Sequence, residues 1–175
     1  MQRAIKYLAY ALLTAVIFTS CGDNVSLQRY YVDNQESKNF ISQDLPLSLI
    51  ELDKSNFTEA QKEAYNSVNK LNFLGYKVNE TDTETYLAEL AKVKTILSDS
   101  KYNGLMEFSD KGNKISVKYI GTDEEADEVI VFGSAKDMGF GIVRILGDDM
   151  NPDKMVTLIS AFQNANIEEG QIENI

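Results

Sequence analysis

The side chains of this chain that could take part in chemistry are mainly carboxylates, lysines and hydroxyls. Its 175 residues include no histidine and a single cysteine, Cys21. Without histidine the chain lacks the commonest general base, the serine–histidine–aspartate arrangement and every imidazole metal site. Activation of a nucleophile would therefore fall to Asp, Glu, Lys or Tyr, which need burial and charged partners to reach useful pKa values.

One set of alternating acids could be a metal site. Asp149, Asn151 and Asp153 match the start of a calcium loop, in which alternating oxygens surround the ion. The sixth position of such a loop requires glycine and is Lys154 here, and the twelfth requires glutamate and is Ser160. Asn151 also fits a helix cap, and a helix favours acids in its first turn. We therefore expect no metal and no cofactor.

Other acids could serve acid–base hydrolysis as pairs, notably Asp148 with Asp149 and the run from Asp123 to Glu125. These acids lie in predicted loops, where water keeps carboxylates near their ordinary pKa values. A Gly139-x-Gly141 motif precedes a strand, so it fails as a phosphate cradle and instead predicts a turn and a bulge. We expect no catalytic residue, and a histidine-free hydrolase remains the alternative.

The N-terminal segment predicts export. Arg3 and Lys6 form a positive region, and Tyr7 to Phe18 is an apolar run broken only by Thr14. This pattern is typical of a signal peptide, and the run is too short for a membrane-spanning helix, which needs about twenty residues.

The residues that follow predict lipidation. The tetrad Phe18-Thr19-Ser20-Cys21 resembles the bacterial lipobox, in which the cysteine is acylated and becomes the first mature residue. Phe18 departs from the leucine that this motif prefers. Each buried methylene contributes about 0.8 kcal/mol, so the two or three acyl chains of bacterial lipoproteins, palmitate among them, give stable anchoring. We expect residues 1–20 to be removed and residues 21–38 to form a lipidated tether, in which the patch Tyr30–Val32 is either a short strand or a spacer that docks on the domain.

The charge of the chain excludes one class of partner. The precursor carries 17 Lys and Arg against 27 Asp and Glu, a net charge of −10, and removal of Arg3 and Lys6 with the signal peptide makes it −12. Such a surface repels nucleic acid and anionic headgroups, so we expect no nucleic-acid partner.

The remaining sequence predicts helices and strands in mixed order. A short strand over 39–43 and a possible helical turn over 44–52 come first. Two capping boxes follow, at Thr58 and at Thr81, each three residues before Gln or Glu. The second opens the clearest helix, whose buried stripe is predicted to be Leu87, Leu90, Val93 and Leu97.

After residue 100 the period of the apolar residues changes to two. Two strands, 104–109 and 114–120, flank a turn at 110–113, and an acidic loop over 122–128 leads to strands 129–133 and 140–146. Asn151 and Pro152 open a last helix. The order predicts an α+β single domain over 39–165, with a mostly antiparallel sheet, helices on one face and a C-terminal tail over 166–175.

The hairpin and the strands after it also resemble a known family. Gly104–Phe108, Asp110–Asn113, Val129–Val131 and Val143–Asp148 resemble the domain of unknown function family numbered 4252, found largely in lipoproteins of the Bacteroidetes. The similarity spans roughly 39–162. It implies an envelope lipoprotein and carries no catalytic residue across.

The function expected from the sequence is a non-catalytic binding or interaction module. It would be anchored through acyl chains on Cys21 to a membrane of the cell envelope, facing the periplasm or the surface, with the outer membrane favoured over the inner. Its partner would be an unknown envelope protein. The alternatives are the histidine-free hydrolase and a structural or stress component of the envelope.

Overall fold

A computed structural model describes residues 26–47, 54–78, 82–110, 113–135 and 138–164. Four helices lie in this part of the chain: α2 (Leu27–Asn34), α3 (Glu59–Ser67), α4 (Thr83–Leu97) and α5 (Pro152–Asn164). Six strands accompany them: β1 (Phe40–Pro46), β2 (Val68–Lys77), β3 (Asn103–Asp110), β4 (Asn113–Gly121), β5 (Ala126–Ala135) and β6 (Gly139–Met150).

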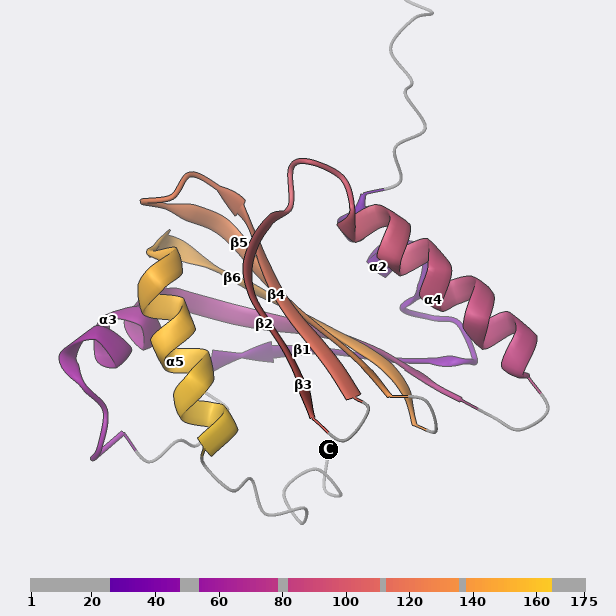
Figure 1. The fold of residues 1–175 in the computed structure, drawn as a ribbon, viewed down its shortest axis with the longest axis horizontal. Coiled ribbons are helices and arrows are strands. Elements are labelled where there is room, and N and C mark those ends of the chain that lie inside the picture. Colours follow the sequence, from indigo (N-terminus) through magenta and orange to yellow (C-terminus); the bar gives the residue numbers. More distant parts are fainter. Residues whose placement is uncertain (1–25, 48–53, 79–81, 111–112, 136–137, 165–175) are drawn as a thin grey trace, which may run out of the picture.

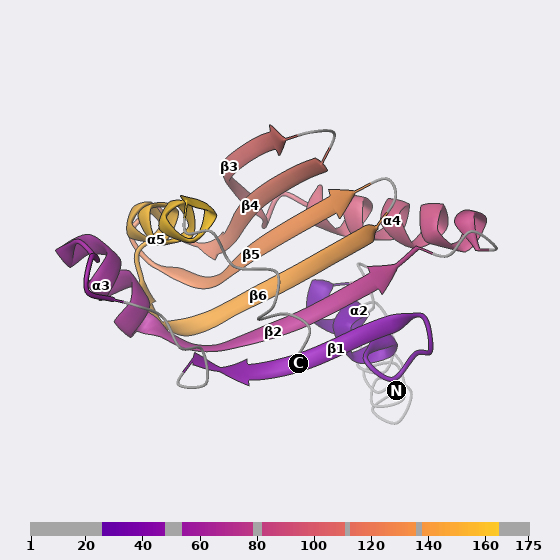
Figure 2. The ribbon, with the colours of Figure 1, turned by 90° about the horizontal axis from the view of Figure 1, so that it is seen from below.

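The six strands form one antiparallel sheet in the order β1-β2-β6-β5-β4-β3 (Figure 2). Strands β3 to β6 follow one another as a meander, and β2 closes on β6 to bring β1 to the edge. The predicted α+β class and the mostly antiparallel sheet are confirmed. Asp110 pairs with Asn113, as the predicted hairpin requires.

Apolar side chains fill both faces of the sheet. In β5, Ile130 and Phe132 belong to one buried cluster, whereas Val129 belongs to a second cluster. In β6, Ile142 belongs to the first cluster and Ile145 to the second. Because neighbouring side chains of a strand point to opposite faces, the two clusters lie on opposite sides of the sheet.

Each cluster is covered by its own pair of helices, as Figure 1 shows with the sheet between α4 and α5. Helices α2 and α4 cover the first face (face A) through Leu27, Tyr30, Val93 and Leu97. Helices α3 and α5 cover the second face (face B) through residues that include Ala64, Met155 and Leu158.

The placement of the helices is the part of the fold prediction that the structure corrects, because the helices are divided between the two faces. A strand covered on both faces is apolar at consecutive positions. The run Val129-Ile130-Val131-Phe132 has that pattern, since three of the four side chains are buried and Val131 is half-buried.

The fold also begins earlier than the sequence indicated. Leu27, Tyr30 and Tyr31 of α2 are buried in the face A cluster, and Ser26 caps the helix by accepting a hydrogen bond from the Arg29 amide. Part of the segment assigned to the tether therefore packs as a helix on the domain. The lipidation site Cys21 and residues 1–25 lie outside the described residues.

The two capping predictions had different outcomes. At α3, Thr58 and Gln61 exchange both hydrogen bonds of the predicted box. At α4 the cap residue is Asp82, one position later than predicted, and its side chain caps no amide of the helix. The Asp82 carboxylate instead accepts a hydrogen bond from the Tyr76 hydroxyl at 2.9 Å.

The buried stripe of α4 also differs from the prediction. Val93 and Leu97 are buried, as expected, but Leu90 is only partly buried and Leu87 is 55% exposed. Tyr86 is buried in place of Leu87.

Three further boundaries differ from the sequence prediction. Strand β1 continues to Pro46, which an edge strand tolerates, so the helical turn expected over 44–52 is absent from 44–46, and 48–53 lie outside the described residues. Gly139 ends a turn with a positive φ of 121°, but no bulge accompanies it. Glu128, placed in a loop from sequence, lies in β5.

No helix within the described residues is long and apolar enough to cross a membrane.

Candidate functional site

The acids singled out from the sequence fall into two groups, one in the loop between β4 and β5 and one around the end of β6 and the start of α5, and two of them form side-chain hydrogen bonds. The Asp123 carboxylate accepts a hydrogen bond from the Tyr119 hydroxyl at 2.5 Å. The Asp148 carboxylate accepts one from the Asn69 amide at 2.8 Å. Among the residues that the structure describes, no three His, Cys, Asp or Glu side chains form a group that could hold a metal ion.

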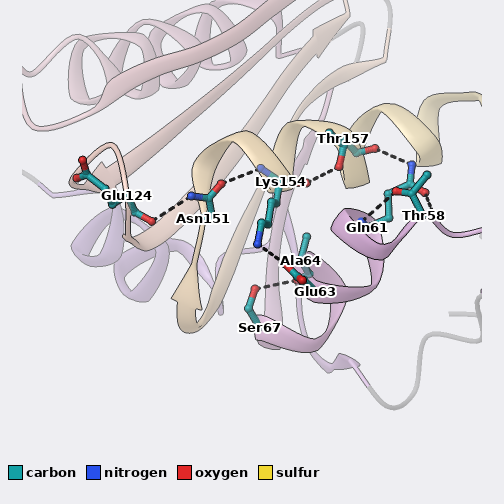
Figure 3. Close-up of polar contacts among 9 residues, drawn as sticks. All are labelled: Thr58, Gln61, Glu63, Ala64, Ser67, Glu124, Asn151, Lys154 and Thr157. Carbon is teal, nitrogen blue, oxygen red and sulfur yellow. Dashed lines mark hydrogen bonds and ion pairs between the residues drawn. The ribbon is translucent and has the colours of Figure 1, made fainter.

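The calcium-like segment forms the start of α5. The Asn151 side chain accepts a hydrogen bond from the Lys154 amide at 3.1 Å and donates one to the Glu124 carbonyl at 3.3 Å (Figure 3). This side chain therefore caps the helix, as the sequence indicated, and ties it to the loop between β4 and β5.

A polar hollow of about 430 Å³ lies between α3 and the start of α5. Glu63, Asp148 and Asp149 line it together with Lys154. The Lys154 ammonium forms an ion pair with Glu63, and the Gln61 side chain reaches the Thr157 carbonyl on the opposite helix (Figure 3). These contacts join α3 to α5, so part of the polar lining serves to hold the two helices together.

A buried ion pair lies on face A. The Arg144 guanidinium donates two hydrogen bonds to Glu128, at 2.6 and 2.9 Å, and both residues are less than a tenth exposed. Burial opposes the charged guanidinium, but the hydrogen bonds and charge of Glu128 outweigh burial and raise the pKa of Arg144. Asn72 continues the polar row across the sheet by donating to Asp44.

Several tyrosine hydroxyls near this face are held in the neutral form. Burial raises the pKa of Tyr76 to about 12, and the hydrogen bond to Asp82 adds to the shift. Burial likewise raises the pKa of Tyr30, whose hydroxyl donates to Glu89 at 2.7 Å. These hydroxyls act as structural donors, and their raised pKa moves them further from the phenolate form that a nucleophile would require.

The apolar residues of face B extend beyond α3 and α5 and form a hollow of about 370 Å³, which we call the glycine trough. Its walls come from β1, β2, β4, β5 and β6 and from Met138 before β6, and its lining is almost entirely apolar. Five residues, one from each of five strands, form a row across it in the order Ile41, Gly75, Gly141, Gly133, Ile115. Three adjacent glycines therefore form its floor.

The packing of the trough explains two of these glycines but not the third. A Cβ on Gly75 would lie 2.7 Å from the Phe73 ring, and one on Gly141 would lie 3.3 Å from it. A Cβ on Gly133 would meet only Ile115, at an ordinary 3.8 Å. Gly133 also has no positive φ. Neither contacts nor backbone conformation require glycine at 133, and a larger side chain there would fill the trough.

The trough contrasts with the margin of face A. A sheet surface that meets water is normally polar, and the margin of face A carries the exposed Asp44 and the partly exposed Lys118. The trough instead exposes Ile41 and Met138, which are 57% and 67% exposed. An exposed apolar concavity of this kind is the candidate interaction surface of the domain.

Sequence reasoning missed this surface because its floor is assembled from three separate strands. Gly75 and Gly133 each stand alone in an apolar strand, and isolated strand glycines indicate a bulge or a close approach of another chain. Their alignment depends on the pairing of β2 with β6, which no local pattern shows.

A family model described as Domain of unknown function (DUF4252) matches residues 30–158, from the middle of α2 into α5. The resemblance noted in the hairpin and the following strands is therefore confirmed. No curated protein and no solved structure matches the chain.

Proposed function

Because this chain belongs to the DUF4252 family, whose description names no activity, we propose its function from the structure. We propose that it is a lipid-anchored protein of the cell envelope that binds, without catalysis, an extended apolar segment of another envelope protein. The observation that carries this proposal is the glycine trough, an apolar concavity in the surface of the domain. The packing does not require glycine at position 133, and a larger side chain there would fill the trough, yet the chain leaves it open.

The anchor rests on the N-terminal sequence. A positive region, a short apolar run and the lone Cys21 after small residues are typical of an exported lipoprotein, and the outer membrane is favoured over the inner. Since α2 begins at Leu27 and a residue spans at most about 3.6 Å, the anchor would lie within about 22 Å of the domain.

The form of the partner follows from the edge strand. Ile41 lies both at the end of the row of trough residues and on β1, the terminal strand of the sheet. A segment that pairs with an edge strand gains backbone hydrogen bonds, and its alternate side chains reach one face. A strand added beside β1 would place those side chains next to the trough.

The absence of catalysis is supported by the surroundings of the acids. The hollow that contains Glu63, Asp148 and Asp149 is the place where a carboxylate hydrolase would act, but Glu63 is paired with Lys154 and Asp148 with Asn69. We therefore expect no turnover of ester, glycoside, peptide or phosphate substrates. Turnover that falls at least a hundredfold in Asp149→Asn would establish the hydrolase instead.

Binding can be tested with a photo-crosslinking residue at position 41 in the full-length chain in cells. The test variant is Gly133→Val, whose side chain fills the trough. The control variant is Gly104→Val: a Cβ at position 104 meets no atom within 4 Å, and Gly104 lies outside the trough. We expect a cross-link to a different envelope protein that Gly133→Val abolishes and Gly104→Val preserves. A cross-link insensitive to Gly133→Val, one to a second copy, or one within the chain would each overturn the proposal.

A further inference from the structure

A third hollow, of about 420 Å³, lies on face A between the end of α4 and the strands β3, β4 and β5. It opens on the face of the sheet opposite to the glycine trough, with which it shares Ile115 and Ser134 as lining residues, and we call it the lysine–serine cleft. Its polar lining consists of three lysines, four serines and one glutamate: Lys94, Lys114, Lys118, Ser98, Ser109, Ser116, Ser134 and Glu107.

Strand register places most of these groups side by side. Ser109, Lys114 and Ser134 form one row across β3, β4 and β5, and Glu107 and Ser116 pair in the next row. Phe132 and Leu97 supply an apolar floor from the core beneath.

The charge of the cleft is opposite to that of the protein. Three lysines against one glutamate give the cleft a charge of +2, whereas the whole chain has 17 basic and 27 acidic side chains. Within the described part of the chain, neither Lys94 nor Lys114 nor Lys118 forms an ion pair. The Lys118 ammonium is instead fixed by donating to the Tyr102 carbonyl at 3.3 Å.

The hydroxyls are also available to a ligand. Ser98 donates to the Thr95 carbonyl, but Ser109, Ser116 and Ser134 make no side-chain hydrogen bond to another described residue. Ammonium groups and hydroxyls are both donors to oxyanions, and lysine binds phosphate as a point charge. A tetrahedral oxyanion with several acceptor oxygens therefore matches this set better than a neutral or cationic ligand.

We propose that the lysine–serine cleft binds the phosphoryl group of a small phosphorylated molecule. A soluble phosphate and the headgroup of an anionic phospholipid both present this phosphoryl group. The experiment below distinguishes which of the two the cleft binds. The site is independent of the glycine trough and of the lipid anchor.

The test measures binding of three probes to the protein by calorimetry: inorganic phosphate, glycerol phosphate, and vesicles of phosphatidylglycerol. The variant is Lys114→Gln, and the matched control is Lys62→Gln, which removes the same charge from an exposed ion pair on α3. Loss of a charged hydrogen bond weakens binding about tenfold or more, so Lys114→Gln should raise the dissociation constant by that factor. Lys62→Gln should leave it unchanged.

Binding of the soluble phosphates with this dependence identifies a soluble phosphorylated ligand, and binding of vesicles alone identifies a lipid headgroup. Absence of binding to all three probes at millimolar concentration, or equal weakening in both variants, would overturn the proposal. Circular dichroism of Lys114→Gln should match that of the parent, because Lys114 is exposed and its side chain forms no hydrogen bond or ion pair with another described residue. A folding defect would contradict that placement.

Discussion

Replacement of the trough glycines by alanine tests the claim that the fold does not need glycine at 133. A glycine in the middle of a strand costs about 0.5–1 kcal/mol relative to alanine, because its backbone loses more conformational freedom on folding. The Cβ of Gly133→Ala would meet only Ile115, at 3.8 Å. The free energy of unfolding should therefore rise by about 0.5–1 kcal/mol, which corresponds to about 1–4 °C in melting temperature.

The other glycines provide an ordered series of controls. In Gly141→Ala the new methyl lies 3.3 Å from the Phe73 ring, so the gain should be cancelled and stability should change little. In Gly75→Ala the distance is 2.7 Å, and the ring must move. In Gly147→Ala the methyl would lie 1.9 Å from the Ser67 carbonyl, which belongs to the backbone, so we expect a loss of about 3 kcal/mol or more.

Urea unfolding followed by circular dichroism would measure the series. The expected order of stability is Gly133→Ala above the parent, Gly141→Ala near it, then Gly75→Ala, with Gly147→Ala lowest. A loss above about 1 kcal/mol in Gly133→Ala would show that the fold requires this glycine and would remove the main argument for the trough as a binding surface.

Three further predictions concern other parts of the chain. Cys21→Ala should release the protein from membranes or leave an unprocessed precursor, and mass spectrometry that finds an unacylated N-terminus elsewhere in the wild type would contradict lipidation. Val93→Ala should lower the free energy of unfolding by about 2 kcal/mol, since the Val93 side chain is fully buried. Leu87→Ala should change it by less than about 0.5 kcal/mol, since Leu87 is exposed. Equal losses for the two variants in urea unfolding would contradict the assigned buried face of α4. The pKa of Tyr76 is raised to about 12 in the folded protein and is about 10 in the unfolded chain. The free energy of unfolding should therefore fall as the pH rises from about 10 to about 12, and it should fall less steeply in Tyr76→Phe. An identical slope in that variant would show that Tyr76 does not contribute.

Features that depend on local pattern were predicted from the sequence. The β3–β4 hairpin follows from the alternation of Ile115, Val117 and Tyr119, and the start of α3 follows from Thr58 and Gln61. Such patterns depend only on neighbouring residues, so a single sequence contains them.

Features that depend on tertiary contacts were not predicted. Helix α2 has only eight residues, so its buried Leu27, Tyr30 and Tyr31 show the helical spacing once, which is too short a pattern to identify a helix. The exposure of Leu87 could not be foreseen either, since the stripe on α4 is set by where the sheet lies. The glycine trough needs the register of β2, β6 and β5, and the lysine–serine cleft needs the position of α4.

The strand order also constrains how the protein folds. Strands β3 to β6 pair with their sequence neighbours, but β2 pairs with β6 at Phe73 and Val143, seventy residues apart (143 − 73). Contacts of such long range form slowly, because the intervening loop must first be closed. We therefore expect the β3–β6 meander to nucleate folding and the N-terminal strands to join late. If the chain is exported from its N-terminus as proposed, β1 and β2 emerge first and wait for β6. Under that proposal β2 would lack its partner β6 until most of the chain had crossed the membrane, which would suit translocation in an unfolded state.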